Sequence, residues 1–215
     1  FRTLGSAGIN VRAIAQGASE RNISAVIDAK EMTRALRTVH ASFYLSAKTV
    51  SIGLIGPGAV GSALLDQLSG EVKRLRKAFN LDLRLRAVGT SKRMHLNDQF
   101  IELGDWRSLV DAGETMDLEQ FVNHIQAEHL PHAVIIDCTA ESDIADQYGE
   151  WLNRGIHVIT PNKRAHSGPI EYYASLKNLS HSANTHFLYE ATVGAGLPVI
   201  QTLKDLVETG DEIES

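Results

Sequence analysis

Short apolar runs and helically spaced apolar residues take turns along the chain from residue 49 onward. Between the runs, apolar residues recur every three or four positions, which is typical of amphipathic helices. The runs occupy positions 49–55, 83–88, 133–139 and 156–159, and all of them except 83–88 are rich in valine and isoleucine, as expected of buried strands. This alternation predicts an α/β fold with a Rossmann-like, doubly wound and mostly parallel sheet.

The helices are predicted from apolar spacing and from the turn residues beside it. The first follows a glycine-rich turn and runs to Phe79, with an interruption near Ser69 and Gly70. Ser142 is expected to cap a helix over 143–153. Further helices are expected over 118–128, from Pro169 to Leu179 and over 199–207, with a strand over 186–189 and an otherwise polar segment 94–130.

Residues 1–48 follow a different pattern. Apolar residues at 9, 11 and 13 predict a half-buried strand, and a second strand over 23–27 favours an antiparallel hairpin. A helix over 31–45 would place Met32, Ala35, Leu36, Val39 and Phe43 on one face. These elements bury too little surface for a core of their own, so we expect a fragment that lacks residues before Phe1. The polar joint at 46–48 is the predicted domain boundary.

A glycine-rich turn joins the first long apolar run to the helix that follows. Gly56, Gly58 and Gly61 occupy the glycine positions of G-x-G-x-x-G. Gly56 would make the tight turn, Gly58 would let a pyrophosphate approach the backbone, and Gly61 would let the helix pack on the strand. The helix N-terminus would offer free N–H groups to the phosphates. This register favours a dinucleotide site; the alternative is a glycine-rich turn without a ligand.

The residues after the second strand bear on which dinucleotide would bind. An NAD site usually has Asp or Glu there, to accept a hydrogen bond from the ribose 2′-OH. This segment, 89–93, reads GTSKR without an acid, and Asp82 lies at the opposite end of the strand. Lys92 and Arg93 would suit a 2′-phosphate. We therefore expect NADP, with NAD as the second choice, unless both side chains are ordinary loop charges.

Polar residues follow two later strands at the sheet edge that the glycine turn shares. Asp137 and Thr139 end one buried run, and residues 160–163 (TPNK) follow the next. Lys163 would there hold a substrate carboxylate or polarise a carbonyl; the alternative is a lysine that faces solvent or a phosphate.

Two other segments bear on metal binding. Residues 190–198 contain two glycines and a proline, and predict an exposed loop that can turn backbone carbonyls towards a cation. Four histidines lack metal-ligand spacing and are expected at the surface: His95, His124, His129 and His132.

Composition narrows the class of protein. The 215 residues are 43% hydrophobic and 22% charged, which is ordinary for a globular protein. The net charge of −5 gives no reason to expect nucleic acid or an anionic membrane as a partner. Cys138 is the single cysteine, which favours a reducing compartment, and without an activating neighbour it is expected to be a buried, inert thiol. No apolar run is long enough to span a bilayer, and no signal-peptide pattern is present, so a soluble protein is expected.

Residues 1–46 resemble the C-terminal part of an ACT domain, a small regulatory module that binds amino acids. The stretches INVRAIAQGASERNISAVID and ALRTVHASF are similar to the last ACT repeat of aspartate kinases. The resemblance implies a partial ferredoxin-like α+β domain. It also places Gln16 where such domains can hold an amino-acid effector, here threonine; the alternative is that Gln16 caps or pairs at a subunit interface.

Residues 49–215 resemble the NAD(P)-binding domain of homoserine dehydrogenase, truncated before the substrate domain. The stretches GLIGPGAVGSALLDQL, VIIDCTA, GIHVITPNKRA and YEATVGAGLPVIQTLKDLVETGDEI occur in that order. With the ACT-like segment upstream, the chain resembles bifunctional aspartate kinase–homoserine dehydrogenase. That family interconverts aspartate 4-semialdehyde and L-homoserine with NAD(P)H, on the route to threonine, methionine and isoleucine.

The resemblance also implies roles for individual residues. Gly58, Ala59 and Val60 match the turn that binds the pyrophosphate, and Thr139 matches a cofactor contact. Lys163 matches the active-site lysine near nicotinamide and substrate. A sodium ion is implied on the backbone carbonyls of Glu190, Val193, Ala195 and Leu197. Because the family's proton donor lies in the missing domain, this chain alone should bind cofactor but turn over poorly or not at all.

The resemblance further implies a homo-oligomer in the cytoplasm or the plastid stroma. Two other functions are open on the residues. An aspartate-semialdehyde dehydrogenase would need an activated cysteine, for which Cys138 is a poor candidate. A regulatory module of ACT and Rossmann domains would sense threonine or cofactor without catalysis.

Overall fold

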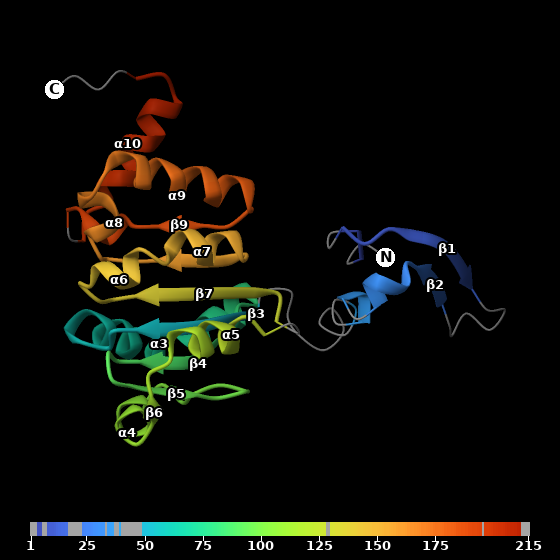
Figure 1. Ribbon diagram of the computed structural model, residues 1–215, viewed down its shortest axis with the longest axis horizontal. Helices are drawn as coiled ribbons and strands as arrows, with labels where there is room; N and C mark the ends of the chain where they lie inside the picture. Colours follow the sequence, from blue (N-terminus) through green and yellow to red (C-terminus); the bar gives the residue numbers. More distant parts are fainter. Residues whose placement is uncertain are drawn as a thin grey trace.

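The structure, a computed structural model, describes residues 4–5, 8–16, 23–32, 34–36, 39, 49–127, 130–194 and 196–211 (Figure 1). The described elements before residue 40 form a small hairpin unit. Those after residue 48 form a layered α/β unit. Within the described part of the chain, no helix is long and apolar enough to cross a membrane.

The hairpin unit contains two antiparallel strands, β1 (Val11–Gln16) and β2 (Ile23–Ile27), as the sequence predicts. A short 3-10 helix, η1 (Ala29–Glu31), follows, and the Asp28 side chain accepts a hydrogen bond from the Lys30 N–H at its start. Leu4, Ile9 and Ala35 are buried together.

The expected apolar helix face in this unit is only partly right. Ala35 is buried and Val39 packs beside it, but Met32 and Leu36 are 56% and 64% exposed. Phe43 lies outside the described residues. The two exposed side chains therefore belong to a surface that the described residues do not cover.

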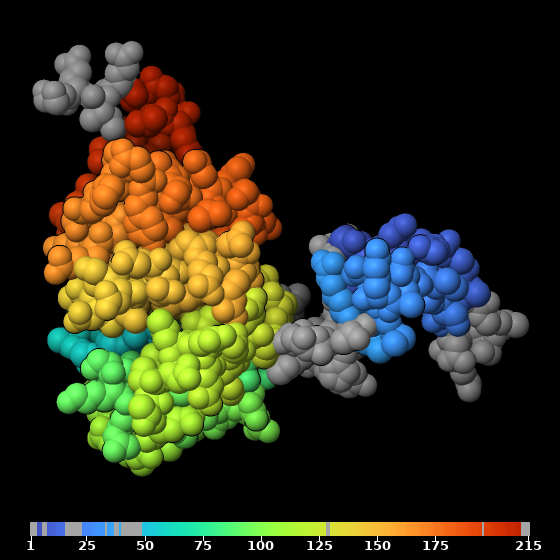
Figure 2. Space-filling model, in the orientation of Figure 1, coloured from blue at the N-terminus to red at the C-terminus, as the bar shows by residue number. Residues whose placement is uncertain are grey.

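The layered unit is built on a sheet that, in the described residues, has seven strands in the order β6-β5-β4-β3-β7-β8-β9. The chain starts at β3, moves outward through β4, and returns to the other side of β3 with β7. Figure 1 shows this division, with β4 and β5 on one side of β3 and β7 and β8 on the other, and in Figure 2 the green residues lie below the yellow and orange ones. The parallel strands are β3 (Thr49–Ile55), β4 (Asp82–Gly89), β7 (His132–Asp137), β8 (Ile156–Ile159) and β9 (Phe187–Leu188). The doubly wound, mostly parallel sheet is confirmed, with a switch point between β3 and β7.

Helices cover both faces of the sheet and bury one apolar cluster on each. One cluster contains Phe121 and Trp151, and the other contains Leu65 and Trp106. Adjacent strand residues alternate between the clusters, so that Ile135 joins the first and Ile136 the second. The helices are α3 (Ala59–Phe79), α4 (Trp106–Asp111), α5 (Leu118–Ile125), α6 (Ser142–Ala145), α7 (Tyr148–Asn153), α8 (Arg164–Ser167), α9 (Ile170–Ser182) and α10 (Val199–Glu208).

Helix α3 runs without the interruption expected near Ser69 and Gly70. A Cβ at Gly70 would meet nothing within 4 Å, so this glycine faces open space and costs the helix only about 1 kcal/mol in propensity. The helix ends at Asn80, which adopts the left-handed conformation with φ 54°.

The helix expected over 143–153 is two helices, α6 and α7. Ser142 is the first residue of α6 rather than its cap, and Glu141 stands at the cap position. Ala145, the last residue of α6, and Tyr148, the first residue of α7, are both buried in the core.

The polar segment 94–117 contains three elements that apolar spacing did not predict. They are α4 and two antiparallel strands, β5 (Arg93–Leu96) and β6 (Glu114–Thr115), of which β6 is at the edge of the sheet. Their apolar residues are isolated in sequence, yet Met94, Trp106 and Val110 are at most 5% exposed.

His124 is not a surface residue, because only 15% of its side chain is exposed. Its Nε2 lies 3.0 Å from the Asn97 carbonyl oxygen, and its own carbonyl accepts from the buried Arg86 guanidinium at 2.7 Å. His95 is partly exposed and His132 exposed, whereas His129 lies outside the described residues.

Candidate functional site

The glycine turn begins directly after β3, and its first residue is packed closely against the residues that follow the neighbouring strand β7. Gly56 adopts φ 81°, and a Cβ there would stand 2.7 Å from Thr139 Cγ2 and 2.9 Å from the Thr139 nitrogen. The Gly56 N–H donates to the Gly89 carbonyl at 2.8 Å. Gly56 is therefore fixed between the ends of β4 and β7, which makes the tight turn that the sequence predicts.

The other two glycines of the motif have opposite surroundings. A Cβ at Gly61 would stand 2.6 Å from the Gly56 carbonyl oxygen, so α3 packs directly on the turn. A Cβ at Gly58 would meet nothing within 4 Å, and no side chain caps the helix there. Ala59 and Val60, the first residues of α3, are exposed. The start of α3 is thus an open, uncapped helix N-terminus, which suits an anion such as a pyrophosphate.

The segment after β4 turns back beside this opening. Thr90 Oγ1 accepts from the Lys92 and Arg93 N–H groups at 3.3 and 3.0 Å, and this turn starts β5. The Arg93 guanidinium donates to the Gly113 carbonyl at 2.8 Å, and the Lys92 side chain is exposed. The one acidic residue of β4, Asp82, lies at the other end of that strand and pairs with Arg84 at 2.9 Å.

A buried carboxylate lies where β7 ends at the same sheet edge. Asp137 is 0% exposed, and its oxygens accept from the Thr139 N–H at 2.7 Å and the Asn162 side-chain amide at 3.0 Å. The Tyr148 hydroxyl donates to Asp137 and lies 2.9 Å from Thr160 Oγ1. Burial first, and then the charge of Asp137, raise the pKa of Tyr148 above its usual value, so this hydroxyl stays protonated.

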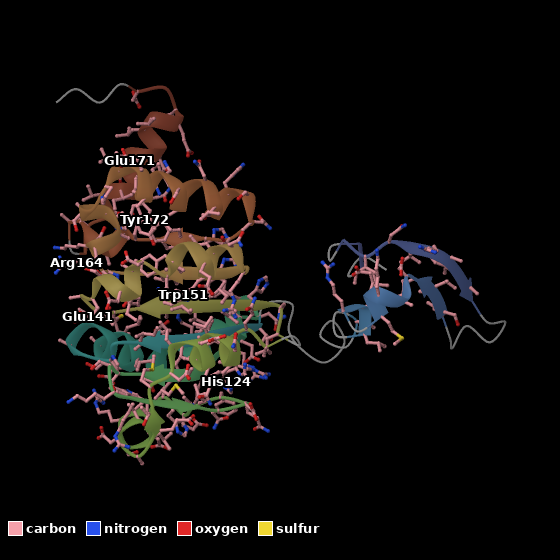
Figure 3. All side chains as sticks on the ribbon, viewed as in Figure 1. His124, Glu141, Trp151, Arg164, Glu171 and Tyr172 are labelled. Carbon is pink, nitrogen blue, oxygen red and sulfur yellow. The ribbon has the colours of Figure 1, made fainter. Side chains whose placement is uncertain are left out.

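Lys163 lines a hollow beside Thr139. The Lys163 side chain is exposed, and its carbonyl accepts from the His166 and Ser167 N–H groups at 3.0 Å as the first turn of α8. The hollow has a volume of about 460 Å³ and is lined by Thr139, Ala140, Pro161, Asn162, Lys163, Arg164 and Ser167. Figure 3 shows Glu141 and Arg164 at this edge, and the Arg164 side chain donates to the Ala140 carbonyl at 3.3 Å.

The described residues also form a larger cavity of about 650 Å³, far from these groups. It lies between the second half of α3 and the start of β4, and its lining includes Arg76, Asp82 and Phe100. Parallel sheets bind ligands at the carboxyl ends of their strands, whereas this cavity lies at the amino ends. We therefore place the candidate site at the glycine turn and the Lys163 hollow.

Cys138 follows β7 and is half-buried. Burial, and secondarily the neighbouring Asp137, raise the pKa of its thiol to about 11. A thiol that stays protonated at neutral pH is a poor nucleophile.

In the loop after β9, an acidic side chain has a structural role. Glu190 begins a 3-10 helix, η2 (Glu190–Thr192), and its carboxylate accepts from the Ile200 and Gln201 N–H groups at 2.8 and 3.0 Å. It therefore caps α10. The Leu197 carbonyl already accepts from the Val199 N–H at 2.9 Å.

Several of the predicted residues lie away from this edge or outside the described residues. Ala195 lies outside the described residues. Val193 is 50% exposed. Gln16 ends β1 in the hairpin unit and pairs with Ile23.

Sequence reasoning missed Tyr148 and Asn162 as parts of the site. Asn162 lies within the TPNK stretch, so its place at the edge was a usable signal. Tyr148 is one aromatic residue in a helix, and only the fold brings it to Asp137.

Comparison with known proteins agrees with this geometry. A family model described as the NAD binding domain of homoserine dehydrogenase matches residues 56–190, and an ACT domain model matches residues 1–43. Bifunctional aspartokinase/homoserine dehydrogenase 2, chloroplastic, from Arabidopsis thaliana is 49% identical over 99% of this chain and 24% of its own length. The bifunctional enzyme of Haemophilus influenzae is 37% identical over 100% of this chain and 26% of its own length. The chain thus spans about a quarter of these curated relatives.

Solved structures show the same fold. A hyperthermophilic archaeal homoserine dehydrogenase mutant, in complex with NADPH, superimposes with a TM-score of 0.60 at 22% identity, over 74% of this chain and 50% of that one. Because the first family model matches more than half of the sequence, the chain belongs to the homoserine dehydrogenase family.

Proposed function

We propose that this chain is the cofactor-binding part of a homoserine dehydrogenase that interconverts aspartate 4-semialdehyde and L-homoserine, within a bifunctional aspartokinase. The observation that carries the proposal is the open N-terminus of α3 above Gly58, which shares one sheet edge with Thr139 and Lys163. The names of the Arabidopsis and Haemophilus relatives support the same activity.

The site fits a nicotinamide dinucleotide. The space at Gly58 admits the pyrophosphate, and the N–H groups of Ala59 and Val60 would donate to it. Thr139 would contact the dinucleotide further along the edge. Lys92 and Arg93 would hold a 2′-phosphate, which favours NADP over NAD. The homologous fold solved with NADPH supports this choice.

A bound nicotinamide would supply the hydride for the carbonyl carbon of the semialdehyde. Lys163 would orient the substrate by its carboxylate or polarise its carbonyl, because Lys163 lines the hollow beside Thr139. The proton that completes reduction would come from a residue beyond this chain.

Replacement of Lys163 in the full-length enzyme tests the proposal. Lys163→Ala should lower kcat at least about 100-fold while the NADPH dissociation constant changes little. Lys77→Ala, which removes an exposed lysine of α3, is the matched control and should leave kcat unchanged. Normal turnover in Lys163→Ala would remove Lys163 from the mechanism. Cofactor binding without any turnover in the unaltered enzyme would favour the regulatory module instead.

No observation favours an aspartate-semialdehyde dehydrogenase, because the protonated, half-buried Cys138 lacks the required nucleophilicity.

The remaining assignments are part of the same proposal. Residues 1–46 would be the ACT-like part, with threonine as effector at Gln16, and 49–215 the NAD(P)-binding domain. A sodium ion would bind the backbone carbonyls of Glu190, Val193, Ala195 and Leu197, where it would shape the loop. The assembly would be a homo-oligomer. The plant relatives are named chloroplastic, which supports the plastid stroma, with the cytoplasm as the alternative.

A further inference from the structure

The Asp137 carboxylate is satisfied entirely by neutral donors from three segments. The Thr139 N–H donates to Oδ1, whereas the Asn162 amide and the Tyr148 hydroxyl donate to Oδ2. A fully buried ionised carboxylate is stable only when such donors surround it. The three donors are therefore held where the carboxylate needs them.

Two of those donors belong to the loops that line the Lys163 hollow. Thr139 stands against Gly56, so its backbone position is coupled to the glycine turn. Asn162 immediately precedes Lys163.

Asn162 forms hydrogen bonds with residues that precede and follow that lysine. Its own N–H donates to Thr160 Oγ1 at 2.8 Å, and its side-chain oxygen accepts from the Arg164 N–H at 3.0 Å. Its amide nitrogen also donates to the Glu141 carbonyl at 3.0 Å. Lys163 therefore lies between Asn162 and Arg164, and the Asn162 side chain holds the Arg164 N–H group.

We propose that Asp137 is a positioning residue, which fixes the spacing between the cofactor loop at Thr139 and the loop that carries Lys163. This rests on the function proposed above. Asp137 is 0% exposed and cannot touch substrate, so it acts through its neighbours. Because small misplacements of catalytic groups are costly, its loss should affect turnover more than cofactor binding.

Asp137→Asn in the full-length enzyme is the direct test. The substitution keeps the shape but turns one acceptor oxygen into an NH₂ group, which then faces a donor. We expect kcat to fall roughly 10- to 100-fold and the NADPH dissociation constant to rise only about two- to fivefold. Amide hydrogen exchange without cofactor should be faster at Thr139, which reports the loop independently of activity.

Two further variants separate positioning from stability. Ser51→Ala removes a buried hydrogen bond of 2.8 Å to the Ile125 carbonyl, away from the site, and should lower the melting temperature but leave kcat unchanged. Asn162→Ala removes the link from the other loop and should reproduce the loss of kcat; it decides the matter if Asp137→Asn does not fold.

The proposal is overturned if folded Asp137→Asn retains kcat within about twofold and Thr139 exchange is unchanged. If the unaltered enzyme shows no turnover, the proposed function fails, and the exchange result at Thr139 alone then decides whether Asp137 holds the loop.

Discussion

At the scale of single residues, the glycines of one motif have different physical roles. Gly56 is required by a positive φ and by its contact with Thr139, whereas Gly58 has an ordinary backbone conformation and open space in front of it. The pattern G-x-G-x-x-G predicted both positions, but only the structure separates a steric requirement from a binding requirement.

This contrast predicts opposite outcomes for two alanine variants. Gly58→Ala should keep the free energy of unfolding within about 0.5 kcal/mol and raise the NADPH dissociation constant at least about tenfold, because its Cβ enters the space for the pyrophosphate. Gly56→Ala should lower the free energy of unfolding by about 1–3 kcal/mol. Urea unfolding and a fluorescence titration measure both. Undiminished NADPH binding in Gly58→Ala would show that the opening is not the phosphate site.

The raised pKa of Cys138 predicts slow alkylation. At pH 8 its thiolate fraction, and hence its rate with iodoacetamide, should be about two orders of magnitude below that of an ordinary thiol. Urea-unfolded protein is the internal control and should react at the ordinary rate. Equal rates in folded and unfolded protein would mean that the thiol is not shielded.

At the scale of elements, strong apolar runs predicted the strands β3, β7 and β8 well, because burial on both faces demands such runs. The strand β4 was also predicted, although Arg84 and Arg86 interrupt its apolar residues. The elements β5 and α4 were missed because they bury only one or two residues, such as Met94 and Trp106, inside polar sequence, and β6 was missed because both of its residues are exposed. Tertiary contacts rather than local pattern decide such short elements.

Helix α10 depends on a cap that is distant in sequence. Glu190→Gln should lower the free energy of unfolding by about 0.5–1 kcal/mol, and Glu190→Ala by about 1–2 kcal/mol, because Ile200 and Gln201 lose a charged acceptor. Glu208→Gln, at the other end of α10, removes a charge that opposes the helix dipole and should be neutral or slightly stabilising. If urea unfolding showed that Glu190→Gln and Glu208→Gln lower the free energy of unfolding equally, the capping role of Glu190 would be contradicted.

The amino ends of β7, β8 and β9 bring three imidazoles together. The His157 ring lies 6.1 Å from that of His132 and 5.1 Å from that of His186 between centroids, and its Nδ1 accepts from the His186 N–H at 2.9 Å. Burial, and then the charges of His186 and His132, lower the pKa of His157. Protonation at Nδ1 would break the hydrogen bond.

Stability should therefore fall as the solution becomes acidic. Because the pKa of His157 is lower in the folded state than in the unfolded state, the unfolded chain binds this proton first. The contribution of His157 is complete above about pH 6.5 and is lost as the pH falls through the folded pKa. His157→Asn should flatten urea midpoints between pH 7 and 5, whereas His181→Asn, at an exposed position, should not. The half-buried His166, whose pKa is also lowered, should keep part of the pH dependence of stability.

At the scale of the whole molecule, the candidate site is assembled from segments far apart in sequence. Sequence reasoning placed Gly58, Thr139 and Lys163 at one edge because parallel strands end together. It did not predict that Asp137 joins two of these loops, because hydrogen bonds between side chains distant in sequence leave no local pattern. The cation loop after β9 and the effector position Gln16 stay predictions.

The measurement that tests this account most directly is a titration of the chain with NADPH and with NADH, followed by fluorescence or calorimetry. The account predicts saturable NADPH binding that is tighter than NADH binding, weakened by Gly58→Ala, and loosened towards NADH affinity when Lys92 and Arg93 are both replaced by alanine. Failure of either dinucleotide to bind, in a sample whose circular dichroism shows intact helices, would contradict the assignment of this sheet edge as a dinucleotide site.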